Sequence, residues 1–161
     1  MISNFRAKKD ETRMKYFLGS HFDTEATRYG VLMEKFARKK FEEVTGYVIT
    51  EVGLVVRQGF DWLGGSPDGI FLNEHGQLCA YESKCPFKCK DKNIQMDYLE
   101  HVRVQNENGD RTMKTVLKKN HPYYAQVQLQ MYVTHAKLCH FFVWSSVDHK
   151  HIVIEFDETY C

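Results

Sequence analysis

The residues of this chain best suited to chemistry are an aspartate, a glutamate and a lysine. Asp68 is followed by the run Glu82-Ser83-Lys84. Side chains two positions apart in a strand point the same way, so Glu82 and Lys84 share a face if residues 78–84 form a strand. Two carboxylates meeting at one point repel each other unless a cation lies between them, and oxygen ligands suit Mg²⁺ or Mn²⁺. A lysine beside such a metal can orient water or neutralise charge in a phosphoryl transition state. The pattern therefore predicts metal-dependent cleavage of a phosphodiester.

A β-hairpin is the element that must position these residues. Residues 69–73 and 78–84 are predicted as its strands, joined by a short polar turn that contains Gly76. Apolar residues on both sides of Glu82 indicate a buried strand, in which Glu82 and Lys84 would be costly without partners or a metal. The alternative is a glutamate and a lysine on a solvated strand face, since short motifs of this kind often arise by chance.

A helix over about residues 24–45 is predicted in front of the hairpin, because its apolar residues recur at helical spacing and Gly46 is a natural stop. Gly30 lies one turn before Glu34. We expect this glycine to let the helix approach the sheet closely, so that Glu34 reaches the metal directly or through water. The alternative for Glu34 is an exposed helical glutamate.

The remaining elements complete the predicted architecture. A strand, continuous or broken near Gly53, is predicted over 47–57. A second helix is predicted over 121–136 with Asn120 as its cap, and two final strands over 139–145 and 151–156. This order predicts an α/β fold of the restriction-endonuclease-like kind, with a mixed central sheet flanked by helices.

The second helix carries polar side chains of two expected kinds. Tyr123, Gln126 and Gln130 lie three and four residues apart, so they line one face. A glutamine beside a metal centre can hold water or a phosphate oxygen without adding charge. Gln128 is expected on a solvated face, and Trp62, before the hairpin, is expected in the core.

Composition favours one intracellular globular domain over residues 1–161. The hydrophobic fraction is 43% and no run approaches the length needed to span a membrane. The five cysteines follow no disulfide framework, and the first residues do not form a signal peptide. We therefore expect a protein of the cytoplasm or nucleus of a host cell that is not secreted and does not bind a membrane.

The net charge of +1 hides an uneven distribution. Residues 1–40 carry ten Lys or Arg against five Asp or Glu, and residues 84–119 carry nine against five, whereas residues 41–83 carry one against seven. This distribution is expected if basic edges follow phosphates while an acidic centre binds cations. The alternative for any one basic run is a solvated helix face.

Several motifs together resemble a known family. The runs Gly-Ser-Pro-Asp-Gly at 65–69 and Tyr-Glu-Ser-Lys-Cys-Pro-Phe at 81–87 resemble the PD-(D/E)XK nucleases, and within them the lambda exonuclease branch, also called YqaJ-like viral recombinases. Further resemblances lie at Ile2-Ser3-Asn4-Phe5, 28–34, 123–128 and 152–155.

The resemblance implies a role for each matching residue. Asp68, Glu82 and the carbonyl of Ser83 would bind Mg²⁺, for which Mn²⁺ could substitute, and Glu34 would support the first or a second metal. Lys84 and Gln126 would position the attacking water. The residues expected to contact DNA or its phosphates are Ser3, Ser66, Tyr123, Lys88 and Lys118.

The resemblance also implies a substrate and partners. The expected activity is 5′-to-3′ exonuclease digestion of double-stranded DNA in recombination or replication. A homotrimer and a single-strand annealing protein are the expected partners. Residues 87–120 are expected to be an insertion or a hairpin that touches DNA, with an oligomer contact equally open. The alternatives are an endonuclease or nickase of the same fold, or a DNA-binding module without catalysis.

Overall fold

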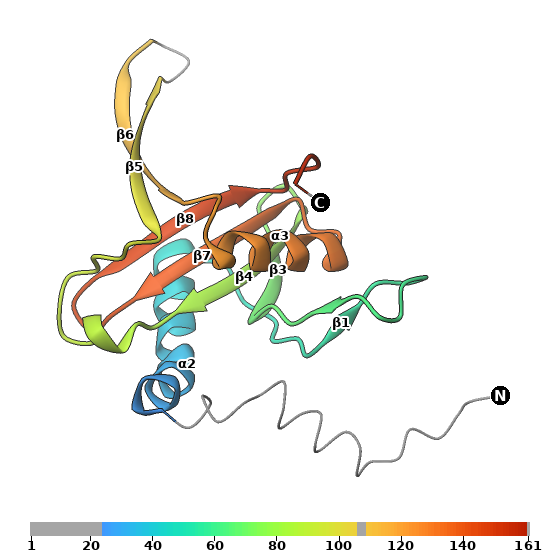
Figure 1. Ribbon diagram of the computed structural model, residues 1–161, viewed down its shortest axis with the longest axis horizontal. Helices are drawn as coiled ribbons and strands as arrows, with labels where there is room; N and C mark the ends of the chain where they lie inside the picture. The colour runs from blue at the N-terminus through green and yellow to red at the C-terminus, as the bar shows by residue number, and fades with distance from the viewer. Residues whose placement is uncertain (1–23, 106–108, 161) are drawn as a thin grey trace.

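The computed structural model describes residues 24–105 and 109–160, and a four-stranded sheet forms its centre (Figure 1). Strands β4 and β7 pair in parallel, and the two outer pairs are antiparallel. The sheet is therefore mixed, as predicted. Its strands in spatial order are β3 (Gly69–Leu72), β4 (Leu78–Lys84), β7 (Leu138–Trp144) and β8 (His149–Glu155).

Helix α2 (Glu25–Thr45) matches the first predicted helix closely. The Thr24 side chain caps it by accepting a hydrogen bond from the N–H of Thr27, which satisfies one of the free donors of the first turn. Gly46 ends it in the left-handed conformation with φ of 76°, and its N–H bonds to Glu42 O. The sequence signals at both ends therefore operate as expected.

Helix α3 (Pro122–Thr134) is the second predicted helix, but its cap is not Asn120. His121 occupies the cap position, where its Nδ1 accepts a hydrogen bond from the N–H of Tyr123. Pro122 fits the first turn because the N–H it lacks would have no partner there. The cap prediction was one residue early because an imidazole can replace the usual short polar side chain.

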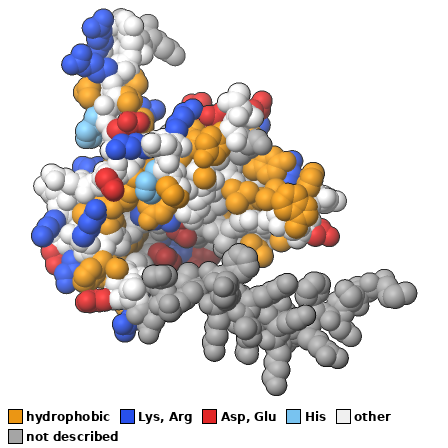
Figure 2. Space-filling view, viewed as in Figure 1, with side chains coloured by type: hydrophobic (Ala, Val, Ile, Leu, Met, Phe, Trp, Pro, Cys, Tyr) orange, Lys and Arg blue, Asp and Glu red, His pale blue; other side chains and the backbone are white. Residues whose placement is uncertain are grey.

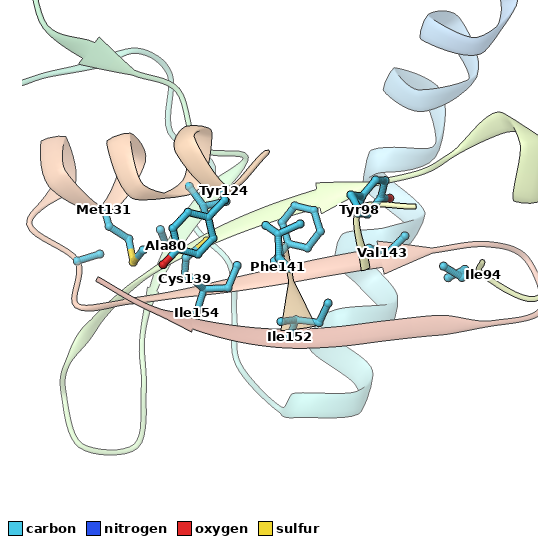
Figure 3. Packing of buried hydrophobic residues seen from close by; sticks show 13 residues of the cluster. Ala80, Ile94, Tyr98, Tyr124, Met131, Cys139, Phe141, Val143, Ile152 and Ile154 are labelled. Carbon is cyan, nitrogen blue, oxygen red and sulfur yellow. The ribbon is translucent and has the colours of Figure 1, made fainter. Parts of the chain in front are cut away.

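The two helices cover opposite faces of the sheet (Figure 1). On the α2 side, Phe41 packs against the rings of Phe71, Tyr81 and Phe142. On the α3 side, a larger cluster contains Tyr124, Met131, Ala80, Phe141 and Ile152 (Figure 3). Because β4 is buried from both sides, it lies at the centre of the fold.

Short elements and a hairpin complete the described residues. The strand predicted over 47–57 is broken near Gly53, the alternative that the sequence left open, but its extent was wrong: the segment forms only an isolated bridge between Thr50 and Ile70, and then the two-residue β1. Its apolar side chains do not alternate into the core, since Val48 and Leu54 are exposed. The remaining elements are β1 (Val55–Val56), β2 (Gly64–Gly65), the 3₁₀ turn η2 (Phe87–Cys89), β5 (Leu99–Gln105) and β6 (Arg111–Leu117).

Trp62 lies between β1 and β2 and is 80% exposed, so its predicted place in the core was wrong. Its ring contacts Phe60, which is also exposed. Within the described residues, neither helix is long and apolar enough to cross a membrane.

Two glycines, Gly30 and Gly69, differ in whether the surrounding structure leaves space for a side chain. A Cβ at Gly30 would meet no atom within 4 Å, so this residue is not what allows α2 to approach the sheet, contrary to expectation. A Cβ at Gly69 would lie 2.3 Å from Cγ2 of Ile49 and 3.0 Å from the carbonyl oxygen of Thr50. Gly69 is therefore the position at which close packing against Ile49 and Thr50 leaves no room for a side chain.

Substitution of these glycines should have opposite effects on stability. Gly69→Ala should lower the free energy of unfolding by about 1–3 kcal/mol, because the added methyl overfills a packed site. Gly30→Ala should raise it by roughly 0.5–1 kcal/mol, because alanine is favoured inside a helix. Urea unfolding followed by circular dichroism measures both, and equal midpoints for the two variants would contradict this packing.

A buried histidine in β7 predicts how folding depends on pH. His140 is 6% exposed, and burial together with the neighbouring His151 lowers its pKa to about 4. The two imidazoles share a hydrogen bond of 2.9 Å, and Phe41, Tyr47 and Phe71 pack around the His140 ring. His140 is therefore held neutral in the folded protein.

Acid should destabilise the protein through His140. Between the ordinary histidine pKa of about 6.5 and the folded value of about 4 the unfolded chain binds the extra proton, so stability falls as the pH falls through this window. The loss should approach about 3 kcal/mol at the acidic end. Urea unfolding of the wild type and His140→Gln from pH 7 to 4 measures it. The variant should show a shallower pH slope, whereas His75→Gln, in an exposed turn, should keep the wild-type slope.

Candidate active site

The alternation of β4 divides the candidate residues between two sides of one strand. Ala80, which precedes Glu82 by two residues, packs in the cluster beneath α3, whereas Tyr81 packs in the cluster beneath α2. Glu82 and Lys84 therefore point toward α3, and Ser83 points toward α2. The site is built around the end of β4, with contributions from both layers.

Glu82 is the most heavily bonded side chain of the site, although it is only 2% exposed. Its Oε1 accepts hydrogen bonds from Lys84 Nζ at 2.5 Å and from Gln126 Nε2 at 2.7 Å. Its Oε2 accepts one from Gln130 Nε2 at 2.8 Å. A buried carboxylate is tolerated only when donors surround it, and here the strand and α3 supply three of them.

Burial and pairing act against each other in this group. Burial raises the pKa of Glu82, and the Lys84 ammonium works in the opposite direction. For Lys84, burial disfavours the charged form, but the Glu82 carboxylate outweighs it and the pKa of Lys84 is raised. Lys84 therefore keeps its positive charge at neutral pH.

Asp68 lies immediately before β3 and binds the other side of β4. Its Oδ2 accepts hydrogen bonds from the backbone N–H and from the hydroxyl of Ser83, both at 2.8 Å. Both hydrogen bonds from described residues fall on this one oxygen, so Oδ1 is left for another ligand. Asp68 was expected to meet Glu82 and Lys84 at the end of the hairpin; its hydrogen bonds go instead to Ser83, which lies between them in sequence.

Glu34 of α2 lies beside two cavities at this point of the molecule. One has a volume of about 400 Å³ and is also lined by Gly30, Lys84 and Tyr123. The other has a volume of about 210 Å³ and is lined by Glu34 with Asp68 and other residues. Partial desolvation raises the pKa of Glu34, and the neighbouring Asp68 carboxylate raises it further. Figure 2 shows acidic side chains recessed near the centre of the visible face.

The residues expected to contact DNA fall into three groups. Ser66 is exposed on the smaller cavity, and Tyr123 lines the larger one with its ring 4.7 Å from Lys84 Nζ. Lys88, on η2, and Lys118, after β6, line neither cavity. Ser3 lies outside the described residues.

Two glutamines of α3 have roles that differ from the sequence interpretation. Gln130 was given no role, yet its Nε2 bonds to Glu82 and, at 3.2 Å, to the carbonyl oxygen of Ser66. Its position one helical turn after Gln126, on the same face of the helix, could have indicated that it also contacts the site. Gln128 is fully buried rather than solvated: it donates to Glu155 O and accepts from the N–H of Asp157, which ties α3 to the end of β8.

The donors of the site suit a hard divalent cation. The Asp68 and Glu82 carboxylates lie near enough to Glu34 to raise its pKa, and Gln130 Oε1 is buried without a hydrogen-bond partner among the described residues. Across residues 24–105 and 109–160, no three His, Cys, Asp or Glu side chains converge to hold a metal by themselves. A Mg²⁺ or Mn²⁺ ion would therefore take further ligands from the main chain, water or substrate.

Substitution of the two buried glutamines should distinguish the one that only stabilises the fold, Gln128, from the one that also acts on Glu82, Gln130. Gln128→Leu and Gln130→Leu each remove buried hydrogen bonds and should lower the free energy of unfolding by about 1–3 kcal/mol. Only Gln130→Leu should raise the pKa of Glu82, because the Gln130 amide stabilises the ionised carboxylate. Urea unfolding and a carboxyl ¹³C NMR titration measure the two effects. A Glu82 pKa that moves equally in both variants would contradict this assignment.

Two viral alkaline nucleases are similar in sequence to this chain. The chain is 31% identical over 111 residues to the alkaline nuclease of Autographa californica nuclear polyhedrosis virus, a match that covers 60% of this chain and 25% of the relative. It is 26% identical over 148 residues to the alkaline nuclease of Orgyia pseudotsugata multicapsid polyhedrosis virus, covering 82% and 34%. The chain therefore spans about a quarter to a third of the length of these relatives.

The chain has the same fold as a solved bacterial structure, and its sequence matches a known domain family. The alkaline exonuclease from Laribacter hongkongensis superposes with a TM-score of 0.61 at 20% identity, covering 98% of this chain and 74% of that one, and its complex with dAMP gives the same TM-score. The YqaJ-like viral recombinase domain matches residues 2–137, which include every predicted site residue. The chain therefore belongs to the YqaJ-like viral recombinase domain family.

Proposed function

We propose that this chain is a metal-dependent DNA nuclease that digests double-stranded DNA from a 5′ end. The observation that carries the proposal is the cluster at the end of β4. There Glu82, Lys84 and Gln126 bond together at 2.5 and 2.7 Å, and Asp68 binds the intervening Ser83. Open cavities on either side of Glu34 give a phosphodiester access to this cluster.

The side chains divide the work of hydrolysis. A bound Mg²⁺ or Mn²⁺ ion, held by Asp68, Glu82 and the Ser83 carbonyl with Glu34 in support, supplies Lewis acidity toward the phosphate. Gln126 offers a neutral amide that can orient water without adding charge. Tyr123 lines the larger cavity over Lys84, where its ring can lie against the backbone of the substrate.

Lys84 acts in this proposal as a cation rather than as a base. The Glu82 carboxylate, 2.5 Å from Lys84 Nζ, favours the charged ammonium, so we give Lys84 the role of a hydrogen-bond donor. It can instead donate hydrogen bonds to the phosphate oxygens as negative charge develops on them. Water attacks the phosphorus in line and the P–O3′ bond breaks, which leaves a 5′-phosphate and a 3′-oxygen. The proton lost by the water passes to solvent, and the 3′-oxygen takes one from solvent to become a hydroxyl.

The proposed substrate and context follow from the family and the relatives. The two baculovirus relatives are named alkaline nucleases, and the family is named for viral recombinases. Digestion of a duplex from its ends would expose single strands for recombination or replication. A homotrimeric assembly and a single-strand annealing partner, both implied by the resemblance, stay predictions.

The test is digestion of 5′-phosphorylated linear duplex and covalently closed circular DNA with Mg²⁺ or EDTA. The wild type should degrade only the linear duplex, and EDTA should abolish the reaction. Lys84→Ala should lower the rate at least about 100-fold, because it removes a charged donor from the transition state. Lys137→Ala, an exposed lysine that pairs with Glu158 away from the site, should keep full activity.

Each other outcome would redirect the proposal. Cutting of the circle would make the protein an endonuclease or nickase at the same site. DNA binding without cleavage in Mg²⁺ or Mn²⁺ would make it a binding module. Activity that survives Lys84→Ala would show that the cluster at the end of β4 is not the active site.

A further inference from the structure

The β5–β6 hairpin projects from the body of the protein and has two chemically different faces (Figure 1). The pairing places Arg103 opposite Met113 and Gln105 opposite Arg111, so these residues share one face with the pair His101 and Thr115. We call this the basic face: His101, Arg103, Gln105, Arg111, Met113 and Thr115. The opposite face carries Val102, Val104 and Val116 with Glu100, Thr112 and Lys114.

The cations of the basic face are available to a partner. Arg103 and Arg111 are exposed, and among the described residues neither forms an ion pair. Figure 2 shows Lys and Arg side chains gathered at the outer end of the hairpin. The valines of the opposite face are half-buried, so the basic face is the more exposed of the two.

The foot of the basic face lies next to the cavity beside Lys84. At the foot of the hairpin, a cavity of about 560 Å³ is lined by Leu99, His101 and Thr115 together with Asn93, Gln95 and Met96. Met96 also lines the 400 Å³ cavity beside Lys84. Met96 therefore lies between the candidate active site and the foot of the hairpin, where His101 and Thr115 share a hydrogen bond of 3.0 Å.

The chemistry of this face fits a phosphodiester backbone. Guanidinium groups bind phosphate through paired hydrogen bonds, and amide and hydroxyl side chains add neutral donors. Each seven-residue strand spans roughly 20 Å. That length corresponds to about six base-pair steps of duplex DNA.

We propose that the basic face of the β5–β6 hairpin binds the backbone of duplex DNA beyond the cleaved end and holds the substrate in register. The proposal rests on the proposed function, since it takes duplex DNA as the substrate. It adds a site of affinity outside the catalytic cluster, at Arg103 and Arg111. The opposite face of the same hairpin, with Lys114, takes no part.

The experiment compares the two faces of the hairpin by charge removal. Arg103→Ser/Arg111→Ser and, as the matched control, Lys114→Ser are made in the wild type and in Asp68→Asn. Binding of a fluorescent linear duplex to the Asp68→Asn proteins is measured over a range of salt. The double variant should weaken binding about tenfold or more at low salt, and the slope of log K against log salt should fall by about 0.9 for each arginine. Lys114→Ser should leave both quantities unchanged.

Cleavage by the proteins that retain Asp68 separates the two proposals. With Mg²⁺, the double variant should raise KM with little change in kcat, because the arginines bind the substrate away from the reacting phosphate. Cleavage by the wild type combined with unchanged DNA binding by the double variant would overturn the hairpin proposal alone. Weakened binding without cleavage by any variant would overturn the proposed function and leave the hairpin proposal standing.

A second measurement distinguishes a protein partner from DNA. Sedimentation of the same variants without DNA should show no change in mass. A change in mass, together with wild-type salt dependence of DNA binding, would assign the basic face to contact between copies of the chain and overturn the proposal. Circular dichroism of each variant controls for loss of the hairpin itself.

Discussion

The structure depends on one constraint: the carboxylate of Glu82 is buried, with the half-buried Lys84 as its ion-pair partner, near the end of a strand enclosed on both faces. Glu82 lies in β4, which is covered by α2 on one face and by α3 on the other. Removal of one partner from a buried ion pair typically costs several kcal/mol, because the remaining charge keeps its desolvation penalty. The elements around β4 must therefore supply hydrogen bonds as well as apolar contacts.

Helix α3 is built to meet this requirement. Gln126 and Gln130 lie one turn apart and bond to the two oxygens of Glu82, while Gln128 bonds to the backbone of β8 and of the segment after it. Amide side chains satisfy a buried carboxylate without adding a charge that would itself need a partner. Helix α3 packs against the sheet core and yet carries three glutamines. It is therefore more buried than its polar composition suggests.

The parts of the fold that could be predicted from sequence are those with local causes. β4 was predicted with its observed bounds because its apolar pattern is continuous and Pro86 follows, and α2 because Thr24 and Gly46 mark its ends. The errors share a different origin. Gln128 is buried by partners distant in sequence. The segment over 47–57 lacks a neighbouring strand along most of its length, since only Thr50 pairs with β3. Trp62 lies in a turn region that packs little, so its apolar character did not predict its exposure.

Local sequence could predict part of the candidate site, for the same reason. The residue types and spacing of Asp68, Glu82 and Lys84 were sufficient to predict that all three lie at the same end of the hairpin, because a hairpin brings the ends of its two strands together. They could not predict that Asp68 binds through Ser83, on the other side of β4 from Glu82. This division places the acids in two layers, with Glu34 beside Asp68 and the glutamines beside Glu82. A change in the packing of either helix should therefore move one half of the site relative to the other, and catalytic geometry is tied to the stability of the whole sheet.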